Sequence, residues 1–195
     1  MFRRKHADSQ ASLGAADVGH LALRLVVGGL LAGHGAQKLF GWFGGGGLNG
    51  TSAWLAEMGY APAQPWAVLS GVSEFGGGML TALGLLHPLG PIATLGSMTI
   101  ATLDVHSGHP IWAADCGAEL PVTNMAAAQA SAMADPGALS LDHAIGIRVP
   151  RSLVALTVAG VLTGVLVAES RAKPITRMME EAQDPAPAPE IRLAS

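Results

Sequence analysis

Long apolar segments separated by short polar or turn-rich stretches dominate this sequence. A transmembrane helix needs about 20 mostly apolar residues at a rise of about 1.5 Å per residue. Runs of this kind lie at residues 18–40, 66–86 and 152–168, and a shorter one lies at 89–103. A fifth segment, 120–134, is alanine-rich and carries several polar residues, so it can span a membrane only as an inner, packed helix. The pattern predicts an all-α integral membrane protein, a four-helix bundle with a fifth transmembrane helix after it.

The same pattern divides the chain into four parts. We predict a polar N-terminal tail over residues 1–17, a membrane domain over 18–142, an additional transmembrane helix within 143–170, and a disordered, proline-rich and acidic tail over 171–195. The basic residues Arg3 and Arg4 favour a cytoplasmic N-terminus by the positive-inside rule. Five crossings then place the basic residues of the C-terminal tail outside, against the same rule, so the number of spans is left between four and five.

Composition agrees with a membrane protein and excludes other classes. Hydrophobic residues make up 50% of the chain and charged residues only 13%, whereas soluble proteins carry about 25% charged residues. The 26 glycines suit close helix packing in lipid, and the G-x-x-x-G pairs Gly29/Gly33 and Gly160/Gly164 predict two contact faces. A net charge of −3 without a long basic run argues against nucleic-acid binding. Cys116 stands alone, which excludes an internal disulfide and a Cys-x-x-Cys redox pair.

Three segments carry a family resemblance. They are HGAQKLFGWFGG at residues 34–45, EFGGGML at 74–80 and PGALSLD at 136–142. In this order and spacing they closely resemble the DoxX family of bacterial membrane proteins, over roughly residues 19–142. The resemblance implies a four-helix membrane core in the bacterial plasma (inner) membrane. It also implies the company of membrane redox systems, because family members resemble the small subunit of thiosulfate:quinone oxidoreductase.

Antiparallel threading of the helices brings ionisable and aromatic residues to one side of the membrane. On this side lie the ends of the first and third helices and the beginnings of the second and fourth helices. The candidate quinone or proton site on this side consists of His34, Gln37, Lys38, Trp42, Glu74, His106 and Glu119.

Glu74 is the residue of this set that most needs a partner. Counting from the helix end places it about 13 Å deep, and His34 about 9 Å deep. A lone charge at a helix centre costs roughly 2.5–3.5 kcal/mol on insertion scales, so Lys38 or His34 is expected to pair with Glu74. A carboxylate paired in this way suits proton transfer. In a quinone site, His34 or Lys38 would donate a hydrogen bond to a quinone carbonyl, and Trp42 would pack on the ring. The other reading is an ion pair that only locks two helices together.

The loop after the third helix holds residue types that bind metals. His106, His109 and Cys116 are ligands suited to zinc or copper. They lack the fixed spacing of a four-ligand site, so we predict a polar interfacial loop and no metal.

Two functions fit these features. The first is a membrane subunit of a bacterial respiratory, quinone-linked oxidoreductase complex, acting on a sulfur compound if it follows the family likeness. Such a subunit contacts lipid, anchors a soluble or membrane redox partner, and takes a bound quinone as its cofactor. The sequence shows no haem-ligand pair of obvious spacing, cysteine cluster or nucleotide-binding loop, so redox chemistry would come from a bound quinone or another subunit, and the subunit itself is non-catalytic or weakly catalytic. The alternative is a small-molecule carrier or membrane assembly factor without redox activity.

Overall fold

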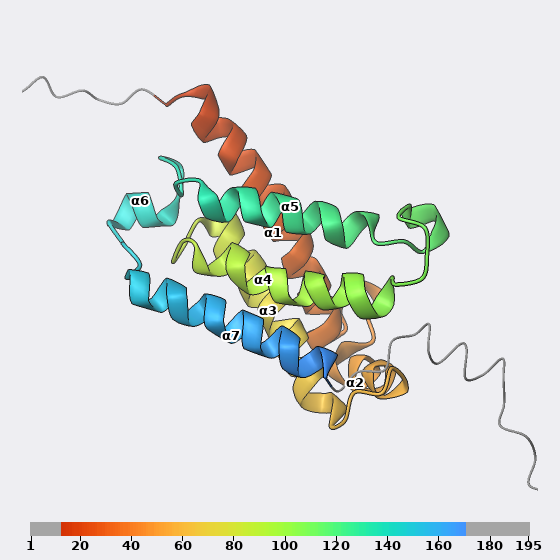
Figure 1. Cartoon of the computed structure of the whole chain (residues 1–195). Helices are drawn as coiled ribbons and strands as arrows, with labels where there is room; N and C mark the ends of the chain where they lie inside the picture. The colour runs from red at the N-terminus through yellow and green to blue at the C-terminus, as the bar shows by residue number, and fades with distance from the viewer. Residues whose placement is uncertain (1–12, 171–195) are drawn as a thin grey trace, which may run out of the picture.

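A computed structural model describes residues 13–170, so most of the predicted N-terminal tail and all of the predicted C-terminal tail lie outside the described residues. Within this range the fold is all-helical and has no strand, as predicted. Figure 1 shows the seven α-helices of this range, which are α1 (Ala15–Phe40), α2 (Gly47–Glu57), α3 (Ala63–Leu83), α4 (Leu89–Ile100), α5 (Glu119–Met133), α6 (Leu141–Ile145) and α7 (Arg151–Glu169). The five predicted long segments correspond to α1, α3, α4, α5 and α7. A π-helical turn, Ala101–Val105, extends α4.

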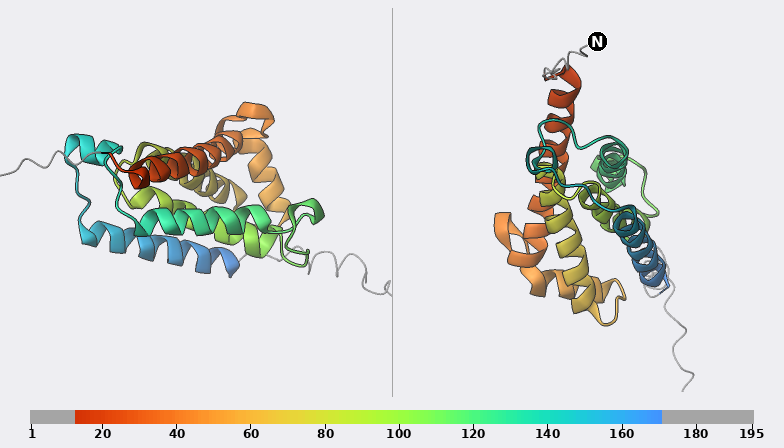
Figure 2. Two further views of the ribbon diagram at one scale, coloured as in Figure 1. Left: turned by 90° about the horizontal axis from the view of Figure 1, so that it is seen from above. Right: turned by 90° about the vertical axis from the view of Figure 1, so that its left-hand side faces the viewer.

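The helix α4 lies at the centre of the fold. It packs against α3, α5 and α7, while α1 packs against α3 and α5 (Figures 1 and 2). Gly35 of α1 lies against Phe75 of α3, and Gly28 lies against Ala82, so these two helices are antiparallel. The helix α7 covers the side of α4 away from α1, and most of its surface is exposed in the isolated chain.

Glycines set the distance between α1 and α3, but they are not the predicted ones. A Cβ at Gly28 would lie 2.5 Å from the backbone of Ala82, and one at Gly35 would lie 2.2 Å from the backbone of Phe75. Around Gly29 and Gly33 nothing lies within 4 Å of such an atom. The prediction that Gly29 and Gly33 form the contact face within the fold was therefore wrong. Spacing shows which residues share a helix face, but it does not show which face meets the neighbouring helix.

Two described helices, α1 and α7, are long and apolar enough to cross a membrane by length and hydropathy. The helix α4 with its π-helical extension is apolar but shorter. The described residues thus hold fewer clear spans than the four or five that were predicted, because α3 mixes apolar residues with glycine and serine and α5 is only 15 residues long.

At the end of the fold where α1 begins, buried charges fasten the α3–α4 turn. The side chain of Arg24 is only 1% exposed, and its Nη2 donates to the carbonyl of Leu139 at 2.9 Å. The buried carboxylate of Asp142 accepts from the backbone N–H groups of Leu86 at 2.8 Å and His87 at 2.7 Å. Burial lowers the pKa of His87 below its ordinary value. The segment around α6 therefore clamps the turn between α3 and α4.

This clamp predicts a stability effect. Asp142→Ala leaves two backbone N–H groups without their acceptor, and each such buried donor costs about 1–3 kcal/mol. We expect thermal unfolding of the detergent-solubilised protein, followed by helical circular dichroism, to shift to clearly lower temperature. Asp135→Ala is the matched control, because Asp135 is an exposed residue of the preceding loop. Equal melting of the two variants would contradict the clamp.

Candidate functional site

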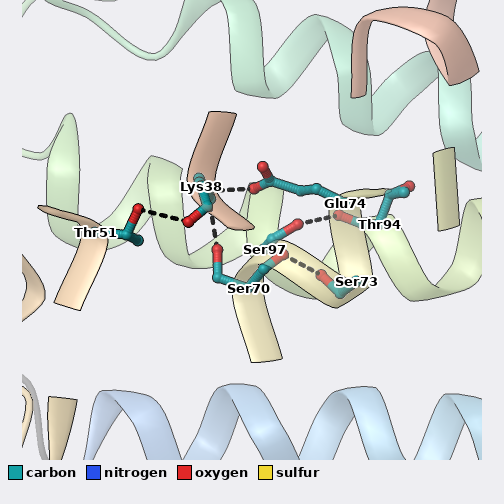
Figure 3. Close-up of polar contacts among 7 residues, drawn as sticks. All are labelled: Lys38, Thr51, Ser70, Ser73, Glu74, Thr94 and Ser97. Atoms are coloured by element: carbon teal, nitrogen blue, oxygen red, sulfur yellow. Dashed lines mark hydrogen bonds and ion pairs between the residues drawn. The ribbon is translucent and has the colours of Figure 1, made fainter. Parts of the chain in front are cut away.

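The buried ion pair between Lys38 and Glu74 is the centre of the candidate site. Lys38 lies in the last turn of α1, and Glu74 lies in the middle of α3. Lys38 Nζ is 2.5 Å from Glu74 Oε1 and also donates to Ser70 Oγ at 2.9 Å (Figure 3). Glu74 is only 1% exposed, whereas the Lys38 side chain is 28% exposed. The expected pairing of Glu74 with Lys38 is present.

The two partners differ in their surroundings. Glu74 Oε2 is buried and has no hydrogen-bond partner among the described residues. A buried charge without full hydrogen bonding is costly, so the carboxylate depends on Lys38 for compensation. Lys38 has three N–H donors, of which Glu74 and Ser70 take two. One donor of Lys38 is therefore left for another acceptor.

A cavity of about 480 Å³ lies beside this pair, among α3, α4 and α7, with α2 at one end. This volume falls in the range of about 300–1,000 Å³ that small-molecule sites occupy. The lining is mostly apolar and rich in small residues, and its polar members include Lys38, Ser70, Ser73 and Ser97. The site thus combines an apolar chamber with a few convergent polar groups, which is typical of ligand pockets.

Aromatic residues close the α2 end of the cavity. Trp54, Tyr60 and Trp66 line it there, and the rings of Tyr60 and Trp66 meet edge to face at 5.6 Å. The buried Tyr60 hydroxyl donates to the buried carboxylate of Asp104, which lies in the π-helical turn. Burial, together with this hydrogen bond, raises the pKa of Tyr60, so the phenol stays protonated at neutral pH. The candidate set from the sequence contains neither residue, because the only local signal for this pair is an acidic residue inside an apolar run.

The other predicted residues of α1 and its exit do not join the pair. His34 is exposed and makes no ion pair with Glu74, so of the two expected partners only Lys38 meets this carboxylate. Trp42 is 54% exposed and packs against Phe40 rather than lining the cavity. Gln37 Nε2 donates to the carbonyl of Phe43 at 3.4 Å and thereby holds the turn after α1.

His106 and Glu119 hold the loop between α4 and α5. The His106 ring pairs Nδ1 with the carbonyl oxygen of Cys116 at 2.6 Å, and Glu119 accepts from the backbone N–H of Ala113 at 2.9 Å. His109 and Cys116 are exposed. Across residues 13–170 no three His, Cys, Asp or Glu side chains are grouped so that they could hold a metal ion. The structure thus gives both predicted residues a local role in the loop and brings neither to Glu74.

The fold and the candidate site together define a class of protein. An all-helical fold, two helices long enough to cross a bilayer, glycine-mediated helix contacts and a buried ion pair beside an apolar cavity are features of helical membrane proteins.

The family model for DoxX matches residues 19–107, which confirms the predicted resemblance to the DoxX family. The match includes the segments at 34–45 and 74–80 and ends before 136–142. No curated protein and no solved structure matches this chain.

Proposed function

We propose that this protein is a membrane subunit of a quinone-linked oxidoreductase complex in the bacterial plasma (inner) membrane, and that the cavity among α3, α4 and α7 holds the quinone. The observation that carries the proposal is the position of Lys38, an ammonium group in the wall of a largely apolar chamber. A quinone is an apolar ring with carbonyl acceptors, so it needs both features. The resemblance to the DoxX family supports the membrane setting and a redox link.

The chemistry of the site follows from its residues. The free donor of Lys38 bonds a carbonyl oxygen, and Ser70 and Glu74 hold the ammonium in place. A positive charge at this position favours the electron-rich, reduced form of the ligand. A bound quinone supplies the electron-accepting chemistry, and a partner redox protein delivers the electrons. Gln37, Trp42, His106 and Glu119, at the same end of the bundle, then belong to the surface that receives this partner.

For the membrane arrangement, we propose five crossings by α1, α3, α4, α5 and α7, with a cytoplasmic N-terminus. The helix α5 completes the family's four-helix core, because it packs on both α4 and α1. The helix α7 runs parallel to α4, since Gly96 lies near Val161 and Asp104 lies near Glu169. It therefore ends on the side where α1 ends.

Quinone binding tests the proposal. We expect the protein purified in mild detergent to retain extractable quinone and to bind added quinone saturably. Lys38→Gln should weaken this affinity about tenfold, because a hydrogen bond to a charged group contributes about 1.5–3 kcal/mol and tenfold corresponds to about 1.4 kcal/mol.

His34→Gln is the matched control, since it makes the same replacement one turn earlier on an exposed face of α1. It should bind quinone like the wild type. Absence of saturable binding, or equal affinities of Lys38→Gln and His34→Gln, would refute the proposal. Substrate flux in proteoliposomes without any redox partner would favour a carrier instead.

A further inference from the structure

We infer that α7 forms the wall of the cavity that holds the ligand's hydrocarbon tail, and that it thereby selects long-chain ligands. This inference rests on the proposed function and adds the substrate class, a quinone with a long isoprenoid tail. The helix α7 lies outside the range that the DoxX model matches, so the family match assigns it no role.

The first step is the shape of the cavity. Both α3 and α7 border it, and α4 contributes small residues such as Ala93 and Gly96 between them. The residues of α7 in the lining extend from Thr157 to Val165, which corresponds to about 12 Å along the helix. The cavity is therefore a trough along α7 and not a compact hole. Figure 3 shows α7 as a separate helix facing the polar cluster.

The second step concerns Gly160 and Gly164, which line the trough. A Cβ built at either position meets no atom within 4 Å. Helix packing within the fold therefore does not require these glycines, in contrast to Gly28 and Gly35, where a Cβ would strike the backbone of α3. Their lack of side chains instead leaves open space along the cavity.

The third step is the division between polar and apolar parts. The polar side chains Lys38, Ser70 and Ser73 come from α1 and α3, on the wall opposite α7. The α7 wall consists in its middle of Gly160, Val161 and Gly164, which offer only apolar contact. A ligand whose ring bonds Lys38 therefore lays its chain along α7, and an apolar chain of this kind reaches the trough from the bilayer.

The experiment compares three probes in detergent: a quinone with a long isoprenoid tail, the same quinone ring without a tail, and an isoprenoid alcohol of the same length. The variant is Gly160→Leu/Gly164→Leu, which fills the trough without touching Lys38. The control is Ala159→Leu, at an exposed position of the same helix. Thr157→Phe, also in the lining, is a second variant that keeps the test valid if the double variant does not fold.

We expect the wild type to bind the tailed quinone at least tenfold more tightly than the tailless ring. The double variant and Thr157→Phe should lose this preference and keep the affinity for the tailless ring, while Ala159→Leu behaves like the wild type. Unchanged preference in both lining variants, or no preference in the wild type, overturns the inference and leaves the proposed function standing. If only the isoprenoid alcohol binds, and binds less to the lining variants, the tail wall stands and the quinone proposal fails. If only the tailless ring binds, the inference fails and the proposed function stands; if no probe binds, both fail.

Discussion

Lys38→Met will destabilise the folded protein by about 3–5 kcal/mol, the cost of removing one partner of a buried ion pair. The reason is the burial of Glu74, which is 1% exposed and whose second oxygen has no partner among the described residues. Without Lys38, no other cation of residues 13–170 pairs with this carboxylate. The measurement is reversible denaturant unfolding in mixed micelles, with the free energy of unfolding compared between variant and wild type.

A double-mutant cycle separates two free energies: the cost of leaving the buried Glu74 charge without its partner, and the stabilisation that the ion pair itself provides. Glu74→Leu should cost less than Lys38→Met, because Lys38 is 28% exposed and keeps its bond to Ser70. The double variant Lys38→Met/Glu74→Leu should recover most of the stability, since an apolar pair of similar volume often replaces a buried ion pair without loss. Additive losses in the double variant would contradict this account. A double variant that is stable but no longer binds quinone would show that the pair serves binding rather than folding.

Gly35→Ala will also destabilise the protein strongly, by about 3 kcal/mol or more, at or above the upper end of the usual cost of overpacking. The new Cβ would lie 2.2 Å from the backbone nitrogen of Phe75 and 2.6 Å from its Cα. Backbone atoms cannot rotate away as a side chain does, so α1 and α3 must separate. The Lys38–Glu74 pair lies one turn away and should loosen with them. Thermal unfolding in detergent and loss of quinone binding measure the two effects.

Gly29→Ala is the matched control for this prediction. It makes the same change on the same helix, but nothing lies within 4 Å of the new atom. Because glycine inside a helix costs roughly 0.5–1 kcal/mol relative to alanine, this variant should be slightly more stable than the wild type. The opposite signs of the two variants are the expected result. Equal effects would show that α1 meets α3 through another face.

Part of the site could be predicted by counting along the chain. Antiparallel threading put Lys38 and Glu74 on the same side of the membrane, and the two side chains do meet. The count brought His34 closer than Lys38 to the depth of Glu74, yet His34 is exposed and does not pair with it. Depth depends on the rise per residue, whereas contact also depends on the rotation of each helix about its axis. Rotation is set by packing, in this case by the glycines that face α3.

Other contacts of the fold left almost no signal in the local sequence. The bond between Tyr60 and Asp104 joins two polar residues from separate segments, and the clamp by Asp142 joins α6 to a distant turn. Neither follows from a motif, because each depends on where two loops come together. Arg24 illustrates the same point, since it lies in the first half of α1 and is buried through its contact with Leu139, more than 100 residues away in the sequence.

The sequence by itself determined the helices, because apolar runs and the breakers between them are local properties. It also determined the resemblance to the DoxX family, because the segments that carry it are local too. It also determined that a buried carboxylate would need a cation. Tertiary structure alone decided which cation that is, which glycines bring helices together and which leave space, and that α7 encloses a cavity with α3 and α4. These depend on how each helix is rotated against its neighbours, and that rotation results from the packing of the whole fold.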